Sequence, residues 1–301
     1  MNSNLHKAKA AKNDEFYTQL SDIENELSNY KDHFRNKVVY CNCDDPKESN
    51  FYTYFYLNYA HLGLKGLIVT CYKNKDINLF SKMTDENAVY MEKYGPGDEQ
   101  YHVHYLNGDG DFRSKECVDI LETVDIVVTN PPFSLFREYV AQLMDHNKKF
   151  LIVGPDLAAA NKDIIPFIKN REIWKGVSRV KKFLQPNGEM KSFGNISWFT
   201  NLDHEKRHEE LTLYRTYNDV DYVKYDNLDA IEVHKTGNDM VKNIPIDYFG
   251  LMGVPVSYLD KHNSEHFEIM GVARYLSDDG RRGHIDGREK QPRIIIKRKQ
   301  Q

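Results

Sequence analysis

Four consecutive residues of the 301-residue chain could perform chemistry: Asn130, Pro131, Pro132 and Phe133. The prolines fix their own φ angles and cannot donate hydrogen bonds, so this turn would present oxygen acceptors rigidly. An amino group on a heteroaromatic ring is a poor nucleophile because its lone pair is delocalised into the ring. The Asn130 side-chain oxygen and the Pro131 carbonyl would draw that nitrogen toward tetrahedral geometry, and Phe133 would stack on the ring. The tetrapeptide therefore predicts group transfer to a planar amino group.

A helix start is the structural alternative for the same residues. Asn130 or Ser134 would then be the N-cap, with a proline in the first turn. The buried stripe of that helix would be Phe136, Tyr139, Val140 and Leu143. Two consecutive prolines followed by an aromatic residue are more restrictive than a cap requires, which favours the chemical interpretation.

Short apolar runs alternate with helical patterns around this turn. Helices are predicted over 21–34 and 49–62, the second closed by Gly63, and strands over 37–43, 67–72, 125–129 and 150–153. Strands separated by helices form βαβ units, so the fold class is α/β with an open, Rossmann-like, doubly wound sheet. Ligands of such sheets bind beyond the carboxyl ends of the strands, where Asn130 lies.

The composition is that of a globular protein, with 40% hydrophobic and 29% charged residues. A mean hydropathy of −0.68 and the absence of a long apolar run predict no membrane contact, and the N-terminus lacks a secretion signal, so we expect a cytoplasmic protein. The four cysteines (Cys41, Cys43, Cys71 and Cys117) and the 12 histidines lack the spacing of paired ligands. We therefore predict buried thiols and no metal site.

Positive charge is concentrated in two segments although the formal net charge is −4. Residues 271–301 contain nine Lys and Arg against four Asp and Glu. A second cluster comprises Lys175, Arg179, Lys181, Lys182 and Lys191, with Glu189 as its acidic member. Both segments suit a nucleic-acid backbone, and a solvated protein face is the alternative for each.

A long series of motifs resembles one enzyme family. The motifs are NDEFYT (13–18), YCNCDDP (40–46), SNF (49–51), LGLKGLI (62–68), GDGDFRS (108–114), TNPPFSLFREYV (129–140), WFTNLD (198–203) and MGVPVSYLDK (252–261). In this order they resemble the EcoRI-type adenine-specific (N6) DNA methyltransferase family over most of the chain. The resemblance implies the S-adenosylmethionine-dependent methyltransferase fold with a smaller C-terminal DNA-recognition region. It also implies S-adenosylmethionine as methyl donor, a flipped-out adenine of duplex DNA as acceptor, and a role in restriction-modification or self-protection.

The resemblance further implies contacts to the methyl donor from three segments. They are Phe16, Tyr17 and Thr18 near the N-terminus, Asp44 and Asp45 after the first strand, and Asp111 and Phe112 in a glycine-flanked turn. An aromatic face under the sulfonium would supply a cation–π contact of roughly 0.5–2 kcal/mol. The carboxylates would accept hydrogen bonds from the adenine amino group or the ribose of the donor. Packing of the N-terminal arm, an Asx-turn at Asp111 and helix capping by Asp45 are the structural alternatives.

This chain departs from many methyltransferases at the first two strands. No glycine-rich turn follows the first strand, and the second ends in Cys71 and Tyr72 rather than in an acidic residue. The donor contacts above therefore rest on the family resemblance and not on a general motif.

Residues of three segments are predicted to contact DNA. They are Lys181, Lys182 and Trp198, together with Arg281, Arg282, Lys297 and Arg298 of the basic tail. We expect Trp198 and Phe199 to be an exposed aromatic pair that lines the pocket of the flipped base. Packing in the core is the alternative. For the tail, the alternative is that Ile294, Ile295 and Ile296 form a closing edge strand that the basic residues only solubilise.

We expect a catalytic domain over 1–215 and a target-recognition region with the basic tail over 216–301. The expected protein is a monomer that acts on duplex DNA, with a cognate restriction endonuclease encoded nearby as a further candidate partner. By family resemblance alone, the recognition sequence would be GAATTC. Cytosine-N4, RNA and protein amides are alternative acceptors for the same turn, and a catalytically inactive nucleic-acid-binding homologue is the alternative from another class.

Overall fold

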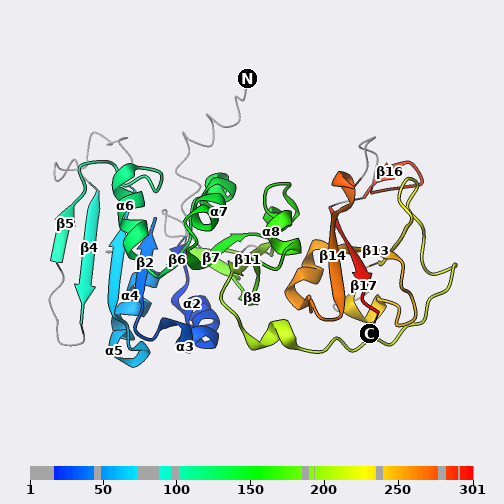
Figure 1. Cartoon of the computed structure of the whole chain (residues 1–301), viewed down its shortest axis with the longest axis horizontal. Helices are drawn as coiled ribbons and strands as arrows, with labels where there is room; N and C mark the ends of the chain where they lie inside the picture. Colours follow the sequence, from blue (N-terminus) through cyan, green and yellow to red (C-terminus); the bar gives the residue numbers. More distant parts are fainter. Residues whose placement is uncertain are drawn as a thin grey trace, which may run out of the picture. The chain divides into compact units, whose positions relative to one another are not determined.

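The computed structural model describes residues 17–43, 49–72, 88–95, 102–184, 190–192, 194–234, 240–276, 283–290 and 292–300. The chain folds into two compact units (Figure 1). The larger unit contains Met1–Gly154 and Ser178–Leu202, and the smaller unit contains Pro155–Val177 and Asp203–Gln301. The smaller unit therefore takes a segment from the middle of the chain as well as the C-terminal third.

A mixed sheet of eight strands has the order β5-β4-β3-β2-β6-β7-β11-β8, and its strands other than β8 form the centre of the larger unit. Four neighbouring strands are parallel: β3 (Gly66–Thr70), β2 (Val38–Asn42), β6 (Ile126–Thr129) and β7 (Lys149–Pro155). The remaining strands are β4 (Val89–Tyr94), β5 (His102–Tyr105), β8 (Trp174–Arg179) and β11 (Ile196–Thr200). A second, three-stranded sheet joins β1 (Tyr17–Thr18), β9 (Lys182–Leu184) and β10 (Met190–Ser192).

Helices cover both faces of the central sheet. Adjacent residues of a strand point to opposite faces, and on β11 Trp198 packs on Phe51 of α4 (Asn50–Leu57) while Phe199 packs on Phe136 of α7 (Phe136–Asp145). These two helices therefore lie on opposite faces of the sheet. The other elements of the unit are α2 (Leu20–Leu27), η1 (Ser28–Tyr30), α3 (Lys31–Phe34), α5 (Tyr59–Leu62), α6 (Lys115–Thr123) and η2 (Phe133–Leu135).

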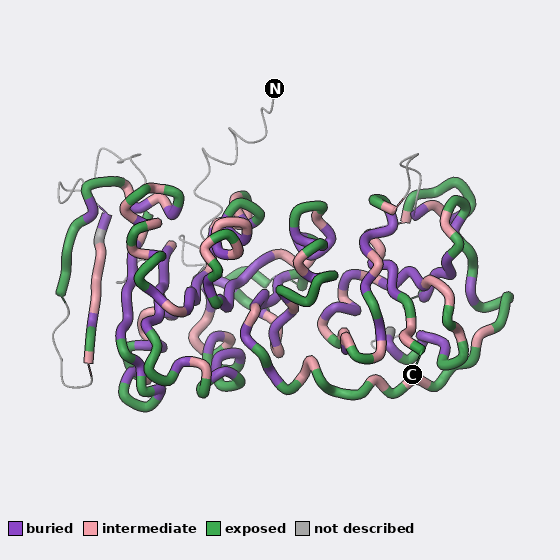
Figure 2. Tube along the Cα trace, viewed as in Figure 1, coloured by how far each residue is buried: buried purple, intermediate pink, exposed green. Residues whose placement is uncertain are grey.

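The predicted α/β elements are confirmed by this arrangement. Ser49 caps α4 by accepting hydrogen bonds from the backbone N–H groups of Phe51 (3.1 Å) and Tyr52 (3.3 Å). Gly63 ends α5 with a φ of 61°, a left-handed conformation that glycine adopts without strain. Strands β2, β3 and β6 are buried along their whole length, which explains their apolar sequences (Figure 2).

Strands β4 and β5 were not predicted, and they make the sheet mixed rather than parallel. β4 runs antiparallel to β3, and β5 runs antiparallel to β4. All four residues of β5 are exposed (Figure 2), so this edge strand has no apolar run that a sequence pattern could reveal.

The smaller unit is built on a four-stranded sheet in the order β12-β13-β17-β14. Its strands are β12 (Ala230–Glu232), β13 (Leu251–Pro255), β14 (Phe267–Val272) and β17 (Arg293–Arg298), and β15 (His284–Ile285) pairs separately with β16 (Arg288–Glu289). The helical elements are α8 (Ile165–Lys169), which packs against β14, and the short η3 (Asp156–Ala160), η4 (Glu205–His208), η5 (Met240–Asn243), η6 (Val256–Lys261) and η7 (Ala273–Tyr275). No helix within the described ranges is long and apolar enough to cross a membrane.

The three isoleucines of the basic tail lie inside this sheet. Ile294, Ile295 and Ile296 are 0% exposed on β17, which pairs with β13 on one side and β14 on the other. The alternative that these residues form a strand is therefore correct, but β17 is a central strand and not an edge strand. Deleting it would remove hydrogen bonds to both neighbours.

Candidate active site

The carboxyl ends of β3, β2, β6 and β7 meet at one edge of the central sheet, since these strands are parallel. The NPPF turn follows β6 at this edge. Asn130, Pro132 and Phe133 are half-buried and Pro131 is buried, so part of the turn is open to a ligand. The Asn130 Oδ1 atom itself is screened from solvent, and an acceptor in such a place binds a donated proton more strongly than it does in water.

The turn does not act as a helix cap. α7 is preceded by the 3-10 turn η2, and the residues that precede these two elements, Pro132 and Leu135, make no side-chain capping bond. The buried stripe of Phe136, Tyr139, Val140 and Leu143 is present as predicted. Helix formation thus accounts for the residues after the turn but not for Asn130 and the two prolines.

Asn42 anchors both ends of the NPPF turn. Its backbone carbonyl accepts a hydrogen bond from the Thr129 hydroxyl, directly before the turn. Its side-chain oxygen accepts one from the hydroxyl of Tyr139, on the helix after the turn. Asn42 and Thr129 are buried and Tyr139 is 0% exposed, so these bonds are protected from water. The last residue of β2 therefore holds the acceptor turn of β6 in place.

The GDGDF turn lies against the carboxyl end of β3. Gly110 has a φ of +78°, and a Cβ atom there would lie 2.1 Å from the carbonyl oxygen of Cys71. Only glycine fits this close approach. Phe112 is buried and packs edge-on against Tyr139, with ring centroids 5.0 Å apart, and its carbonyl accepts from Gln142 Nε2 at 3.0 Å. The structure therefore brings the two sequence motifs together through α7.

Arg113 holds the carboxylate of Asp111. Asp111 Oδ1 accepts from Arg113 Nε at 2.9 Å and Oδ2 accepts from Nη2 at 2.6 Å, while Arg113 Nη1 donates to Glu138 of α7 at 3.1 Å. The backbone N–H of Arg113 also donates to Asp111 Oδ1 at 2.9 Å, which forms the Asx-turn of the structural alternative, so Arg113 orients the aspartate through three hydrogen bonds. The sequence prediction did not include Arg113, although it directly follows the motif.

The N-terminal strand reaches the same region. Thr18 of β1 pairs with Phe183 of β9. The rings of Phe183 and Phe133 contact each other edge-to-face, with their centroids 6.4 Å apart. The Thr18 carbonyl also accepts from Asn50 Nδ2 of α4 at 2.8 Å. Thr18 is buried, and its hydroxyl has no hydrogen-bond partner among the described residues. This hydroxyl is a candidate contact for a ligand.

Other predicted donor contacts lie outside the described residues. These are Phe16, Asp44 and Asp45, and only the backbone of Tyr17 is described. The cysteines that are described carry free thiols, with Cys41 and Cys117 buried and Cys43 and Cys71 half-buried. No group of metal-binding side chains occurs in the part of the chain that the structure describes.

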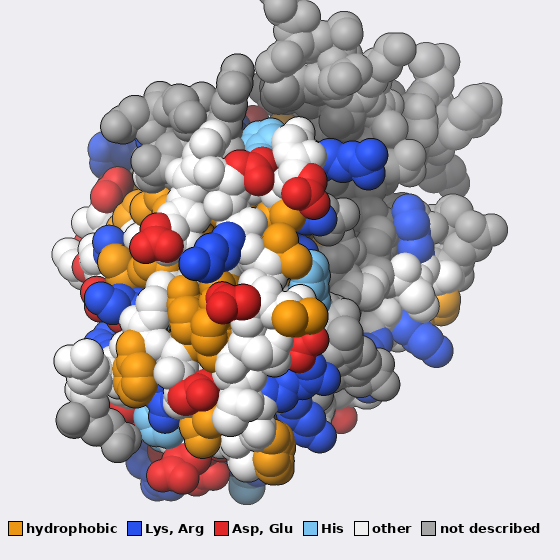
Figure 3. All heavy atoms as spheres, turned by 90° about the vertical axis from the view of Figure 1, so that its right-hand side faces the viewer, with side chains coloured by type: hydrophobic (Ala, Val, Ile, Leu, Met, Phe, Trp, Pro, Cys, Tyr) orange, Lys and Arg blue, Asp and Glu red, His pale blue; other side chains and the backbone are white. Residues whose placement is uncertain are grey.

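The predicted DNA contacts differ in exposure. Lys181, Lys182 and Lys297 are exposed, whereas Arg281 and Arg282 lie outside the described residues. Arg298 lies 5.5 Å above the ring of Phe249, which is 46% exposed. Figure 3 shows one face on which Lys and Arg side chains are interspersed with acidic and hydrophobic ones.

Three members of the predicted basic and aromatic sets are buried. Trp198 and Phe199 are 0% and 1% exposed, so the expectation that they form an exposed pair is wrong. They lie on the fully buried strand β11 and pack under helices on both sides, as the core alternative proposed. Lys175 of the basic cluster is also buried, where it pairs with Asp156 at 2.8 Å.

The NPPF turn lies at the sheet edge next to the GDGDF turn, and comparison with known proteins identifies the class as a methyltransferase. A family model described as "Adenine-specific methyltransferase EcoRI" matches residues 4–300. The chain is 45% identical to Type II methyltransferase M.EcoRI of Escherichia coli, over 99% of this chain and 97% of that protein. It is 34% identical to M.MgeORF184P of Mycoplasma genitalium and 33% identical to M.MpnI of Mycoplasma pneumoniae, both Type II methyltransferases, over 98% of this chain. No solved structure matches significantly.

The chain therefore belongs to the EcoRI-type family of adenine-specific methyltransferases, as the sequence motifs predicted. It is an enzyme of the methyltransferase class with an α/β fold.

Proposed function

We propose that this chain transfers a methyl group from S-adenosylmethionine to N6 of an adenine flipped out of duplex DNA, for restriction-modification or self-protection. The observation that carries the proposal is the NPPF turn, which follows β6 at the carboxyl edge of the sheet and is anchored at both ends by Asn42. Membership of an adenine-specific family supports adenine over the alternative acceptors.

The residues on the donor side fit S-adenosylmethionine. Gly110 leaves no room for a side chain against Cys71, so the GDGDF turn approaches β3 closely, and the Thr18 hydroxyl is buried without a protein partner among the described residues. Thr18 would donate to a polar group of the donor, and the Asp111 carboxylate, oriented by Arg113, would accept from it. When bound, the donor supplies an electrophilic methyl group on a sulfonium.

The acceptor side has the parts that activate an amino group. Asn130 Oδ1 and the Pro131 carbonyl each accept one N–H of the adenine N6 group, so the nitrogen lone pair points at the methyl carbon. Phe133 stacks on the base, and the edge of Phe183 supports the Phe133 ring. The donor would supply its methyl group to this nitrogen, and its sulfur would keep the electron pair of the broken carbon–sulfur bond. The N6 proton then becomes acidic and leaves to water, so no general base is needed before attack.

Base flipping is required because a stacked adenine cannot reach a site at a sheet edge. Its cost of a few kcal/mol is offset by stacking and by contacts to the DNA backbone. We assign the backbone contacts to Lys181, Lys182, Lys297 and Arg298, and to Arg281 and Arg282 outside the described residues. The recognition sequence GAATTC, the role of the smaller unit in target recognition, a partner endonuclease, the monomeric state and a cytoplasmic location stay predictions.

Mass spectrometry of nucleosides tests the proposal. DNA and RNA from cells that express the chain should contain new N6-methyladenine in DNA only, and the Asn130→Ala variant should leave none. Asn195→Ala, at an exposed position of the same unit, is the matched control and should retain methylation. Detection of N4-methylcytosine in DNA would show that cytosine is the acceptor. Methylation of RNA alone would show that RNA is the substrate. No modified base with a folded, DNA-binding protein would indicate an inactive homologue.

A further inference from the structure

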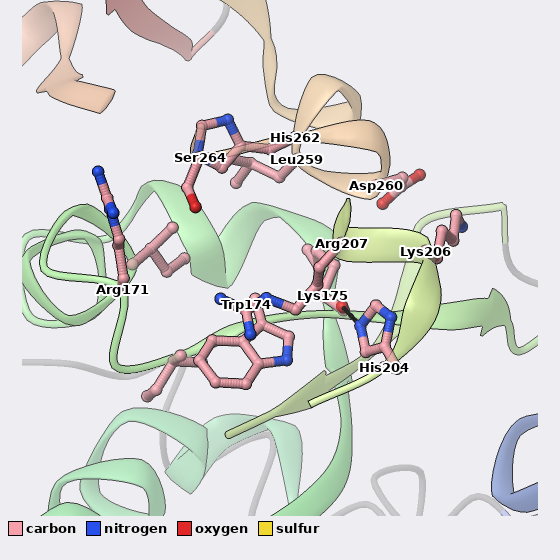
Figure 4. Close-up of a pocket in the computed structure, with 12 residues that line it drawn as sticks. Arg171, Trp174, Lys175, His204, Lys206, Arg207, Leu259, Asp260, His262 and Ser264 are labelled. Carbon is pink, nitrogen blue, oxygen red and sulfur yellow. Dashed lines mark hydrogen bonds between the residues drawn. The ribbon is translucent and has the colours of Figure 1, made fainter. Parts of the chain in front are cut away.

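The smaller unit contains a pocket of its own, with a volume of about 30 Å³ (Figure 4). Four segments of the chain line it: α8 with the turn after it, the start of β8, η4 with the residue before it, and η6 with the loop after it. A cavity of this volume holds one or two waters or a small ion rather than a base or a nucleoside.

Basic side chains dominate the lining, because it contains Arg171, Lys175, Lys206 and Arg207 against Asp260. Lys175 is neutralised by Asp156 at 2.8 Å. Lys206 donates to the carbonyl of Val177 at 2.5 Å. A surplus of positive charge over carboxylates therefore faces this hollow.

Two contacts hold the guanidinium of Arg207 in place, and they use only some of its N–H groups. Its Nη1 atom donates to Asp203 Oδ1 at 2.6 Å, and its planar group lies 3.4 Å above the ring of Trp174. Stacking fixes the plane, and the remaining N–H groups have no acceptor among the described residues. Arg207 is thus a rigid donor at the floor of the pocket.

Arg171 and Ser264 line the same hollow (Figure 4). In the described part of the chain, neither side chain has a hydrogen-bonding or ionic partner. His262 lies beside them, and burial together with the charges of Arg171, Arg207 and Lys299 lowers its pKa to about 4. Burial is the larger cause of this lowered pKa, and the three cations add to it.

The backbone of Arg171 is strained in a way that points to function. Its φ is 62°, at the end of α8, where glycine or asparagine is usual. A long charged residue in the left-handed region costs free energy, and such costs persist where the side chain has a role. Arg171 lines the pocket, and its charge is one of those that lower the pKa of His262.

We propose that this pocket binds a phosphate group, held by the guanidinium groups of Arg171 and Arg207 and by the hydroxyl of Ser264. Guanidinium forks match the oxygens of a phosphate, and a hydroxyl donates a further hydrogen bond. The phosphate belongs either to the DNA backbone, which rests on the proposed function, or to free phosphate, which does not. Both sources share one chemistry, and an experiment separates them.

Inorganic phosphate is the probe, titrated into the full chain while the imidazole signals of His262 and His204 are followed by NMR. Phosphate should shift both signals with a saturable curve. Arg171→Gln should weaken binding about tenfold or more, because it removes a charge-assisted contact. Lys169→Gln removes an exposed charge of the same helix that does not line the pocket, and it should bind phosphate as the wild type does.

Arg171→Gly separates binding from folding. Glycine relieves the positive φ while it removes the cation, so the thermal midpoint should be maintained or raised while phosphate binding is lost. Equal binding by the wild type and both Arg171 variants, or no saturable shift of the two histidines, would overturn the proposal.

A short duplex added to the phosphate complex identifies the source. Displacement of phosphate from the wild-type pocket indicates that the DNA backbone occupies it, and retention indicates a free phosphate ligand. A chain that methylates DNA but shows no phosphate-dependent shift would overturn this inference alone. A chain that binds phosphate here but modifies no nucleic acid would leave the site standing and remove the proposed function.

Discussion

The hydroxyl of Tyr139 on α7 donates a hydrogen bond to the side-chain oxygen of Asn42 at the end of β2, although 97 positions separate the two residues. The backbone carbonyl of Asn42 also accepts a hydrogen bond from the Thr129 hydroxyl. A single asparagine therefore connects β2, the residue before the NPPF turn and the helix after it. We expect Tyr139→Phe to destabilise the fold by about 1–3 kcal/mol, because it leaves the buried Asn42 oxygen without this donor. Urea unfolding measures this, and Tyr214→Phe at a 66% exposed position is the control, with no expected change.

Tyr139→Phe should also lower the rate of methylation when the protein is still folded. The turn would lose one of its two anchors without losing Asn130, so kcat should fall while the KM for the methyl donor stays near the wild-type value. Unchanged kcat in a measurably destabilised variant would limit Tyr139 to a structural role.

Asn130→Ala should reduce turnover about 10²–10³-fold while donor binding is kept. Removal of one preorganised polar contact to the reacting group typically costs this factor. Single-turnover assays measure the rate, and calorimetry with S-adenosylmethionine measures binding. Retention of more than about a tenth of the wild-type rate would contradict the role of Asn130 as acceptor.

Phe133→Ala should impair capture of the flipped base more than overall DNA binding. One stacking contact is worth roughly 1–3 kcal/mol. A duplex with an abasic site opposite the target adenine lowers the cost of flipping and should restore part of the lost activity. The stacking role of Phe133 is wrong if this duplex rescues none of the loss.

Lys297→Gln tests the basic tail without disturbing β17. If Lys297 contacts a phosphate, the slope of log K against log salt should flatten by about 0.9. Preference for one DNA sequence over another should hardly change, because phosphate contacts position a protein and base contacts specify its site. Lys65→Gln, an exposed position of the larger unit, is the control. Loss of thermal stability with an unchanged slope would show that Lys297 stabilises the fold and does not contact DNA.

Stability should fall as the pH drops from about 6.5 toward 4. Burial lowers the pKa of His204 and of His262 to about 4, so in this range the unfolded chain binds protons that the folded chain does not. Each histidine contributes at most about 1.4 kcal/mol per pH unit. Urea unfolding at pH 7.5 and 5 should show a smaller difference for His262→Gln than for the wild type. His61→Gln, at an exposed position, should leave the difference unchanged.

The sequence predicted the elements that carry strong local signals. The segment predicted as one helix forms α4 and α5, with the capping residue Ser49 at the start of α4 and the left-handed Gly63 at the end of α5. The NPPF turn likewise follows a buried apolar strand. Local chemistry was sufficient for these features.

Features that depend on packing between distant segments were missed. Trp198 and Phe199 look like an exposed pair because the sequence does not show that β11 is covered on both faces. Asn42 is a polar residue ending a buried strand, which is a signal, but its partners Thr129 and Tyr139 could not be identified from spacing. The edge strand β5 has no apolar pattern because both of its faces are exposed.

The path of the chain between the two units limits how the enzyme can be dissected. The chain leaves the larger unit after Gly154, returns at Ser178 and leaves again after Leu202. A truncation near residue 215 would keep the segment Pro155–Val177 but remove most of its unit. Helix α8 would then lose β14, the strand against which it packs. Exchange of the smaller unit between relatives therefore requires two coordinated grafts and not one C-terminal swap.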